Sequence, residues 1–133
     1  MKNKAKERAA HAASQLKGHF SLDEAPDVGI ILGTGWGDLL KLDGDKPDLP
    51  FHKIPHFAEL ENLEGHKRVI SVGECGGKTV MALRGRVPLN EGFCDKRILE
   101  CVRLQVQMML ELGIRTFILT NAAGALAERC KKG

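Results

Sequence analysis

Apolar side chains along the chain fall into short continuous runs that alternate with two longer helical repeats. Residues 28–32 (Val-Gly-Ile-Ile-Leu) carry no polar or charged side chain and lead into further glycines. Such a run is typical of a strand buried on both faces, as in a parallel sheet. Residues 67–72 and 78–83 predict two more strands, joined by a hairpin turn at Glu-Cys-Gly-Gly, residues 74–77. Residues 114–120 predict a fourth strand.

Two segments carry apolar residues at the spacing of an amphipathic helix. The first runs from residue 4 to about 18, where Gly18 ends it, and its apolar positions are Ala5, Ala9, Ala12, Ala13 and Leu16. The second runs from residue 95 to 112, before Gly113, and its apolar positions are Leu99, Val102, Val106, Met109 and Leu110. Residues 38–42 are a candidate for a short helix, and residues 43–64, with three prolines, predict a long irregular connection.

The predicted elements occur in the order helix, strand, glycine loop, hairpin, polar loop, helix, strand and small-residue loop. This order indicates an α/β fold. The loops at 33–37 and 121–124 each follow a strand directly. Ligands of such sheets bind outside the carboxyl ends of the strands, so we expect a binding site where these two loops meet.

The composition is that of an ordinary globular protein. The length of 133 residues suits one domain, and 43% hydrophobic with 28% charged residues fit a packed core rather than disorder. The net charge of +3 comes partly from basic residues near the two ends. Nucleic-acid binders concentrate far more positive charge on one face, so we expect no nucleic-acid partner.

The expected compartment follows from signals that the sequence lacks. No segment approaches the roughly 18 apolar residues of a membrane span, and no apolar stretch follows the basic N-terminus, so we expect no membrane segment and no secretory signal. The four cysteines (Cys75, Cys94, Cys101 and Cys130) form no Cys-x-x-Cys pair. Reduced thiols in a cytoplasmic protein are the simplest interpretation.

The glycine loop at 33–37 has the composition of an anion site, because glycines let backbone N–H groups approach an anion closely. The hydroxyl of Thr34 adds another donor. The loop matches neither common nucleotide fingerprint. Asp38 stands where a dinucleotide site needs its third glycine, and residues 38–40 are Asp-Leu-Leu where a P-loop needs Gly-Lys-Ser/Thr. A simple tight turn also explains the glycines.

Several charged side chains have both a binding and a surface interpretation. Arg84 and Arg86 flank Gly85 at the predicted end of a strand. An arginine there can hold phosphate through two parallel hydrogen bonds, or both are ordinary surface residues. His66 is either a hydrogen-bond donor to phosphate or an ordinary surface histidine. Glu91 either orients a neighbouring group and accepts a proton or is simply solvated.

The remaining candidates are considered for contact with a flat ligand, for packing and for metal binding. Asn121 is followed by small residues that leave room for a flat ligand against the backbone. Trp36 either stacks on a base or anchors packing. His52 and His56 are four residues apart, as metal ligands on a helix can be, but Pro55 between them argues against a helix. We therefore expect no metal.

Four segments of the chain, in order, resemble the trimeric type of purine nucleoside phosphorylase in the purine nucleoside and methylthioadenosine phosphorylase family. Residues 30–37 resemble its Ile-Ile-x-Gly-Ser-Gly-x-Gly loop. Residues 54–57 and then 64–66 resemble its phosphate-loop region. Residues 85–93 resemble its Gly-Arg-Phe-His-x-Tyr-Glu-Gly-Tyr segment, and residues 119–126 resemble its Thr-Asn-Ala-Ala-Gly segment.

The resemblance implies a reaction and a set of site residues. Inorganic phosphate, as co-substrate, attacks the anomeric carbon of a purine nucleoside and releases free base and ribose 1-phosphate, with no metal or organic cofactor. The implied phosphate-binding residues are Thr34, His66, Arg86 and Ala122. The implied substrate-binding residues are Asn90, Asn121, Ala123 and Gly124, with Glu91 as the catalytic candidate. The implied fold is a phosphorylase-like three-layer α/β fold with a mixed, mainly parallel sheet, and the implied assembly is a homo-oligomer, a trimer in the family.

The resemblance also marks where this chain departs from the family. Pro88 stands where the family has a histidine that contacts phosphate and sugar, and Asn90 where it has a tyrosine that contacts the sugar. The family's chain continues with a purine-binding half, so we expect residues 1–126 to be the N-terminal part of a truncated phosphorylase domain and 127–133 an unrelated tail. The chain is then either a family enzyme with an incomplete site, or a non-catalytic phosphate- or nucleotide-binding remnant or interaction fragment of the same fold.

Overall fold

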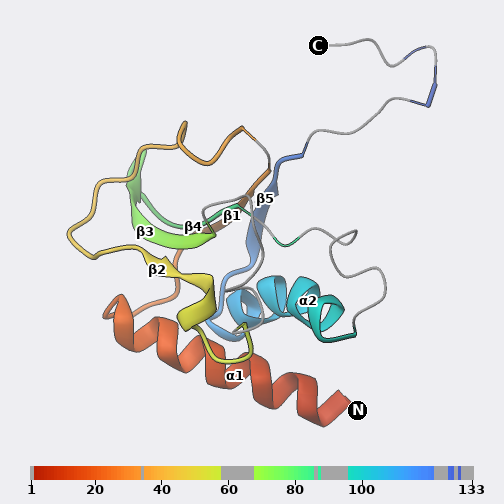
Figure 1. Ribbon diagram of the computed structural model, residues 1–133. Coiled ribbons are helices and arrows are strands. Elements are labelled where there is room, and N and C mark those ends of the chain that lie inside the picture. The colour runs from red at the N-terminus through yellow and green to blue at the C-terminus, as the bar shows by residue number, and fades with distance from the viewer. Residues whose placement is uncertain are drawn as a thin grey trace.

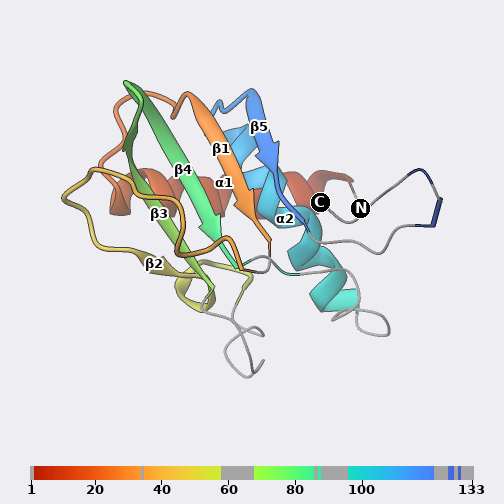
Figure 2. The same ribbon diagram turned by 90° about the horizontal axis from the view of Figure 1, so that it is seen from above.

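A five-stranded mixed sheet forms the centre of the protein, whose computed structural model describes residues 2–33, 35–57, 68–85, 87, 96–121, 126–127 and 129. The strands are β1 (Val28–Leu32), β2 (Leu49–Pro50), β3 (Val69–Cys75), β4 (Lys78–Arg84) and β5 (Thr116–Leu119). Their order is β2-β3-β4-β1-β5, as Figures 1 and 2 show. Strand β1 is parallel to β4 and β5, whereas β3 is antiparallel to β2 and β4. The predicted α/β fold with a mixed sheet is confirmed.

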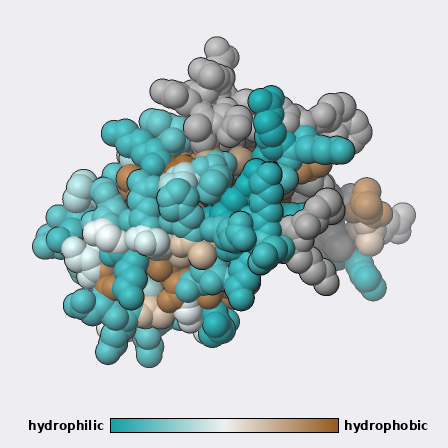
Figure 3. Space-filling model, turned by 90° about the horizontal axis from the view of Figure 1, so that it is seen from below, coloured by the Kyte–Doolittle hydropathy of each residue, from teal (hydrophilic) through white to brown (hydrophobic). Residues whose placement is uncertain are grey.

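Two helices, α1 (Lys2–His19) and α2 (Lys96–Glu111), lie on the same face of this sheet and pack against each other (Figures 1 and 2). The core lies between them and the strands, and its fully buried members include Leu16, Phe51, Phe57, Ile70, Met81, Leu83, Met108 and Met109. Burying each such side chain contributes about 1.5–3 kcal/mol. The surface on the α1 side is mostly hydrophilic (Figure 3), and the exposed residues of α1 include Asn3, Lys4, Lys6, Glu7, Ser14 and Lys17.

The C-terminus of α2 ends as predicted, at a glycine. Gly113 has a φ of 96°, its N–H donates to the Leu110 carbonyl, and the N–H of Ile114 donates to the Met109 carbonyl. These two bonds form a Schellman motif, and the buried side chain of Ile114 completes its hydrophobic contact.

The C-terminus of α1 has the same motif, but a serine takes the left-handed position. Ser21 has a φ of 52°, its N–H donates to the Gly18 carbonyl, and the N–H of Leu22 donates to the Lys17 carbonyl. The predicted end of this helix at about residue 18 is therefore one residue early, and the left-handed residue is Ser21 rather than Gly18. The helix continues through His19, because glycine at that point is tolerated within the last turn and the reversal is made at Ser21.

The β3–β4 hairpin turns where its sequence predicts. Cys75 pairs with Lys78, so only Gly76 and Gly77 lie in the turn, with φ of 58° and 74°. Two successive residues with positive φ define the type I′ turn, whose twist matches that of the flanking strands. Side chains at these positions would be strained, which explains the pair of glycines.

The long segment between β1 and β3 differs from its prediction in two ways. Residues 38–42 do not form a helix, because the chain turns at 35–39 instead, with the Leu39 N–H donating to the Trp36 carbonyl. Residues 43–57 are more ordered than an irregular connection, since they contain β2 and a 3-10 turn, η1 (Phe51–Lys53). Pro50 is tolerated in β2 because this strand lies at the edge of the sheet order.

The face of the sheet opposite the helices is less covered than the apolar sequence of β1 predicts. Val28 and Ile30 are only half-buried, and on β5 the side chains of Ile118 and Leu119 are 48% and 61% exposed. The expectation that residues 28–32 are buried on both faces is therefore wrong for two of its side chains. Both described helices cover the other face, on which Gly29 meets Met109.

Candidate functional site

The three parallel strands end at one edge of the sheet, which brings their following loops together. Leu32 of β1 is level with Arg84 of β4, and Ile31 is level with Leu119 of β5. The arrowheads of these strands point the same way in Figure 2. Gly33, Gly85 and Thr120 therefore leave the sheet at the same edge, where ligands of parallel sheets bind. The predicted convergence of the two loops is confirmed for their described residues.

Gly33 and Thr120 make the closest contact between the loops that follow β1 and β5. The N–H of Gly33 donates to the Thr120 hydroxyl at 2.9 Å, and that hydroxyl donates to the Ile31 carbonyl at 3.4 Å. A Cβ on Gly33 would lie 2.6 Å from the Thr120 carbonyl oxygen and 3.0 Å from the Asn121 Cα. Backbone atoms cannot yield as a flexible side chain can, so this approach requires glycine.

The glycine loop after β1 forms a turn. Gly35 has a φ of 83°, and the Trp36 N–H donates to the Gly33 carbonyl at 3.2 Å. The Trp36 side chain is 49% exposed, so the interpretation of Trp36 as a buried packing anchor is wrong and its ring is accessible. Thr34 lies outside the described residues. The tight-turn interpretation of these glycines is confirmed, and their role in binding an anion stays a prediction.

Arg84 ties the end of β4 to both of its neighbours. Its Nε donates to the Ser71 hydroxyl on β3 at 2.7 Å, and its Nη1 donates to the Gly37 carbonyl. Ser71 is buried and Arg84 half-buried. The interpretation of Arg84 as an ordinary surface arginine is therefore wrong. Its guanidinium is used within the fold, where it fixes the glycine loop against the sheet.

One predicted site residue, Asn121, lies within the described part of the chain. Asn121 is described and exposed, directly after Thr120 at the edge where the strands end. The other candidates lie outside the described residues, and their roles stay predictions: Thr34, His66, Arg86, Asn90, Glu91, Ala122, Ala123 and Gly124. Pro88 lies outside them as well.

Sequence reasoning missed the hydrogen bonds made by three polar side chains: Arg84, Thr120 and Gln105. Each acts through a hydrogen bond to a residue that is 13 or more positions away, namely Ser71, Gly33 or Val87. For Gln105 a signal exists, since it interrupts the apolar face of a helix between Leu104 and Met108. A polar residue on such a face is buried only where a partner satisfies it.

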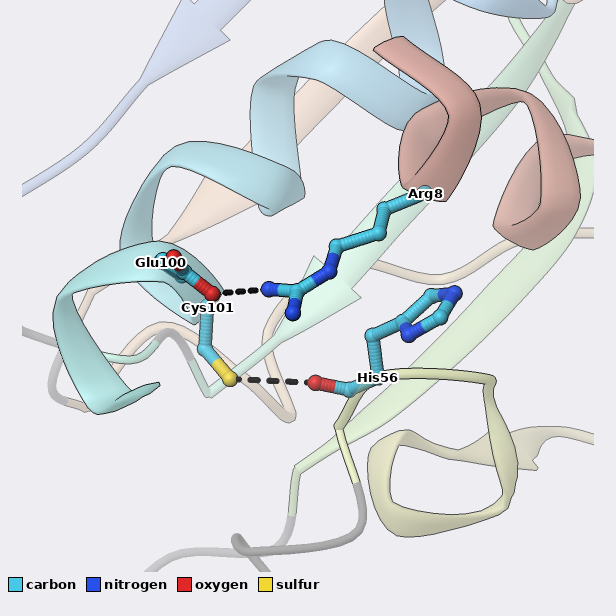
Figure 4. Close-up of polar contacts among 4 residues, drawn as sticks. All are labelled: Arg8, His56, Glu100 and Cys101. Carbon is cyan, nitrogen blue, oxygen red and sulfur yellow. Dashed lines mark hydrogen bonds and ion pairs between the residues drawn. The ribbon is translucent and has the colours of Figure 1, made fainter. Parts of the chain in front are cut away.

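A cavity of about 490 Å³ lies in the helical layer rather than at the strand ends. Charges of both signs line it, among them Lys4, Arg8, Glu100 and Arg103. In Figure 4 Arg8 forms an ion pair with Glu100, and the Cys101 thiol donates to the His56 carbonyl at 3.3 Å. These pairs fasten α1, α2 and the turn before residue 58 to one another, so we interpret this region as structural.

Within the described ranges, no group of three or more His, Cys, Asp or Glu side chains is arranged to hold a metal ion. Neither described helix has the length and apolar character needed to cross a bilayer.

The fold and the edge at which β1, β4 and β5 end define a class of protein. This class is an α/β domain with a glycine-lined loop site at the carboxyl ends of parallel strands. The family model described as the phosphorylase superfamily matches residues 27–133. The chain belongs to that superfamily.

Two bacterial proteins show which members of the superfamily this chain is similar to. Purine nucleoside phosphorylase 1 of Bacillus subtilis is 34% identical over 128 residues, which are 96% of this chain and 45% of that protein. The enzyme of the same name from Geobacillus stearothermophilus is 34% identical over 92% of this chain and 42% of its own length. The chain therefore spans less than half the length of these relatives.

Solved structures of purine nucleoside phosphorylases also match this chain over less than half of their own length. Isoform 2 of purine nucleoside phosphorylase from Schistosoma mansoni, in complex with cytosine and ribose-1-phosphate, matches with a TM-score of 0.74 and 29% identity. The match covers 96% of this chain and 42% of that chain. The Schistosoma mansoni enzyme in complex with inosine matches with a TM-score of 0.70 and 28% identity, over 94% of this chain and 41% of that one.

Proposed function

We propose that this chain supplies the phosphate side of a purine nucleoside phosphorylase site. The reaction converts a purine nucleoside and inorganic phosphate into free base and ribose 1-phosphate. One observation carries the proposal: the loops after β1 and β5 touch at Gly33 and Thr120, at the edge where parallel strands end. These loops contain Thr34 and Ala122, which the resemblance assigns to phosphate, and Asn121, Ala123 and Gly124, which it assigns to the substrate.

Phosphate binding in this proposal falls to Thr34, His66, Arg86 and the backbone of Ala122. A hydroxyl, an imidazole, a guanidinium and a peptide N–H are all donors suited to phosphate oxygens. Phosphorolysis depends on such a set, because phosphate must be held next to the anomeric carbon while negative charge develops on the leaving purine. Neither a metal nor an organic cofactor takes part in the proposed reaction.

The nucleoside side of the proposal uses Asn90, Asn121, Ala123 and Gly124, with Glu91 as the catalytic candidate. Asn121 supports the assignment, because its side chain is exposed at the strand ends directly after the Gly33–Thr120 contact. The ligands of the solved relatives support the substrate class, since inosine and ribose-1-phosphate are a nucleoside substrate and a product of this reaction.

A second candidate function is phosphate binding without turnover. Pro88 favours it, because proline supplies neither an imidazole nor a backbone N–H at a position where the family has a histidine. Asn90 likewise replaces a tyrosine.

The two functions differ in one assay, the release of base from inosine and guanosine by the purified chain with and without inorganic phosphate. Phosphorolysis predicts release that requires phosphate and falls at least about tenfold in Arg86→Ala, because a charged phosphate contact is lost. Arg103→Ala is the matched control, since Arg103 is exposed on α2 and is not a site candidate.

Each outcome of that assay assigns a function. Phosphate-dependent release that survives in Arg103→Ala but not in Arg86→Ala supports the phosphorylase. Phosphate binding by calorimetry without release of base supports the non-catalytic alternative. Folded protein that neither binds phosphate nor releases base contradicts both.

Assembly and compartment complete the proposal. We infer a homo-oligomer, as in the trimeric type that the sequence resembles, and a cytoplasmic location, which reduced cysteines suit. Within the described residues, neither Cys75 nor Cys101 is in a disulfide bond. Analytical ultracentrifugation tests the first inference, since a monomer at micromolar concentration contradicts it.

A further inference from the structure

The helical layer encloses a cavity whose two main walls are α1 and α2. Its volume is about 490 Å³, and small-molecule sites in proteins span about 300–1,000 Å³. In Figure 4 Arg8 reaches from α1 to Glu100 on α2, and His56 lies beside Arg8 on the turn before residue 58. The ion pair and the packing of the two helices hold the walls together. The cavity therefore has the size and the fixed walls that a ligand site needs.

The bottom of this cavity is apolar. It is lined by Ala9 and Leu104, which are only 1% and 4% exposed, and by Ala5, which is half-buried. Leu110 also lines the cavity and is 40% exposed. Contact between such side chains and an apolar group is favourable, because water is released from both surfaces. The cavity therefore suits the apolar body of a small molecule.

The charged side chains around the cavity have a positive excess. Four of the lining residues are lysine or arginine and two are glutamate. One cation and one glutamate form the ion pair between the walls, and on the α2 wall Arg103 offsets Glu111. The two cations that remain are Lys4 and Lys6, and within the described part of the chain neither takes part in an ion pair or a hydrogen bond. The α1 wall therefore offers positive charge to a ligand.

We propose that this cavity binds a small amphipathic organic anion. The apolar body of the anion lies against Ala9 and Leu104, and its charged group faces the two lysines of α1. An inorganic anion gains nothing from the apolar lining, and a neutral or cationic molecule gains nothing from the positive excess. The inference goes beyond the proposed function, because the cavity lies in the helical layer and takes no part in a reaction at the strand ends.

The first test compares two fluorescent ligands that differ in charge. The anion is anilinonaphthalene sulfonate, which has an apolar ring system and one negative charge. The neutral control is phenylnaphthylamine, which has the same rings without the sulfonate. We expect the purified chain to bind the anion at least about fivefold more tightly at low salt, and this difference should shrink at about 1 M salt, where the Debye length is about 3 Å. Equal affinity for the two ligands at low salt overturns the proposal.

Two matched pairs of substitutions on α1 locate the bound anion. Ala5→Phe fills part of the cavity, whereas Ala10→Phe adds the same ring at an exposed position outside its lining. Lys4→Glu reverses a charge at the cavity, whereas Lys17→Glu reverses an exposed charge near the other end of the helix. We expect Ala5→Phe to weaken binding of the anion at least about tenfold and Lys4→Glu about fivefold, and each control to change it less than about twofold.

The two pairs have different diagnostic value. Lys4→Glu should leave the affinity for the neutral ligand unchanged, because only the charged group faces the lysines, whereas Ala5→Phe should weaken both ligands. Far-UV circular dichroism reports whether each variant folds, and Ala5→Leu replaces Ala5→Phe if the larger side chain prevents folding. Equal effects of Lys4→Glu and Lys17→Glu on the anion contradict the proposed placement of its charged group.

Other binding places and occupants give different results. Anion binding that survives Ala5→Phe but is lost in Ile118→Ser places the anion on the exposed apolar side chains of β5 and overturns the proposal. Self-association that sedimentation velocity detects in the wild type but not in Ala5→Phe means that a second copy of the chain covers the cavity, which also overturns it. A folded wild-type chain that binds neither ligand below about 1 mM does the same. Phosphate-dependent release of base tests the proposed function separately, so the failure of either proposal leaves the other standing.

Discussion

Replacing Gly33 with alanine tests whether the two site loops must touch. The added Cβ would meet the Thr120 carbonyl oxygen at 2.6 Å, the Asn121 Cα at 3.0 Å and the Thr120 carbonyl carbon at 3.1 Å. All three are backbone atoms, so the chain after β5 must move away. Gly33 does not adopt the left-handed backbone region, so the penalty comes from these contacts rather than from its own torsion angles.

The expected loss of stability in Gly33→Ala has two parts. Overpacking of this kind costs about 1–3 kcal/mol. Separating the loops also breaks the 2.9 Å bond from the Gly33 N–H to the Thr120 hydroxyl, which contributes about 0.5–1.5 kcal/mol. Together they predict a loss of about 1.5–4.5 kcal/mol. At about 4 °C per kcal/mol for a chain of this size, the unfolding midpoint falls by about 6–18 °C.

The assay is thermal unfolding followed by far-UV circular dichroism, with Gly18→Ala as the matched control. A Cβ at Gly18 meets nothing within 4 Å, and Gly18 lies in the last turn of α1. Alanine there should be neutral or stabilising by up to about 1 kcal/mol, because it restricts the unfolded chain.

Thr120→Val separates the two parts of the Gly33 effect. Valine keeps the shape of threonine but accepts no hydrogen bond, so the single variant should lose about 1 kcal/mol. The double variant with Gly33→Ala should lose less than the sum of the two, since the bond between them is broken only once. A midpoint for Gly33→Ala within about 2 °C of wild type would refute the reasoning, because it would mean that the loops separate at no cost.

Two further substitutions address the ends of helices and strands. Gly113→Ala should cost about 1–2 kcal/mol by chemical denaturation, because Gly113 has a φ of 96° and its Cβ would lie 3.1 Å from that of Ala25; an unchanged denaturation midpoint would contradict this account of how α2 ends. Arg84→Lys should also cost about 1–2 kcal/mol, because one ammonium cannot reproduce bonds from two separate nitrogens to Ser71 and Gly37, and a crystal structure of a stable variant with both bonds remade would show the opposite.

The parts of the fold that could be predicted from sequence are those with a local physical cause. The apolar run of β1 gave the bounds Val28–Leu32, which the structure reproduces. The hairpin between β3 and β4 follows from two glycines that must take positive φ. The end of α2 follows from Gly113 for the same reason. In each case the information lies within a few residues of the feature.

The remaining features depend on partners that are distant in sequence. Ser21 takes the left-handed position at the end of α1, although serine gives no strong local signal for it. Strand β2 exists because Leu49 pairs with Ile70 of β3, which no pattern within residues 43–57 indicates. The roles of Arg84 and Gln105 require knowing which backbone groups lie opposite them. Of the site, sequence therefore predicted the edge at which the loops meet, and not the side chains that hold them.

The exposed apolar side chains of β5 have a consequence for how the protein behaves when the temperature changes. Ile118 and Leu119 are 48% and 61% exposed on a strand at the end of the sheet order. Contact between such surfaces is driven near room temperature by the entropy of released water, and this driving force weakens on cooling. Any association through β5 therefore loosens in the cold and tightens on warming, which is the reverse of association through hydrogen bonds with a favourable enthalpy.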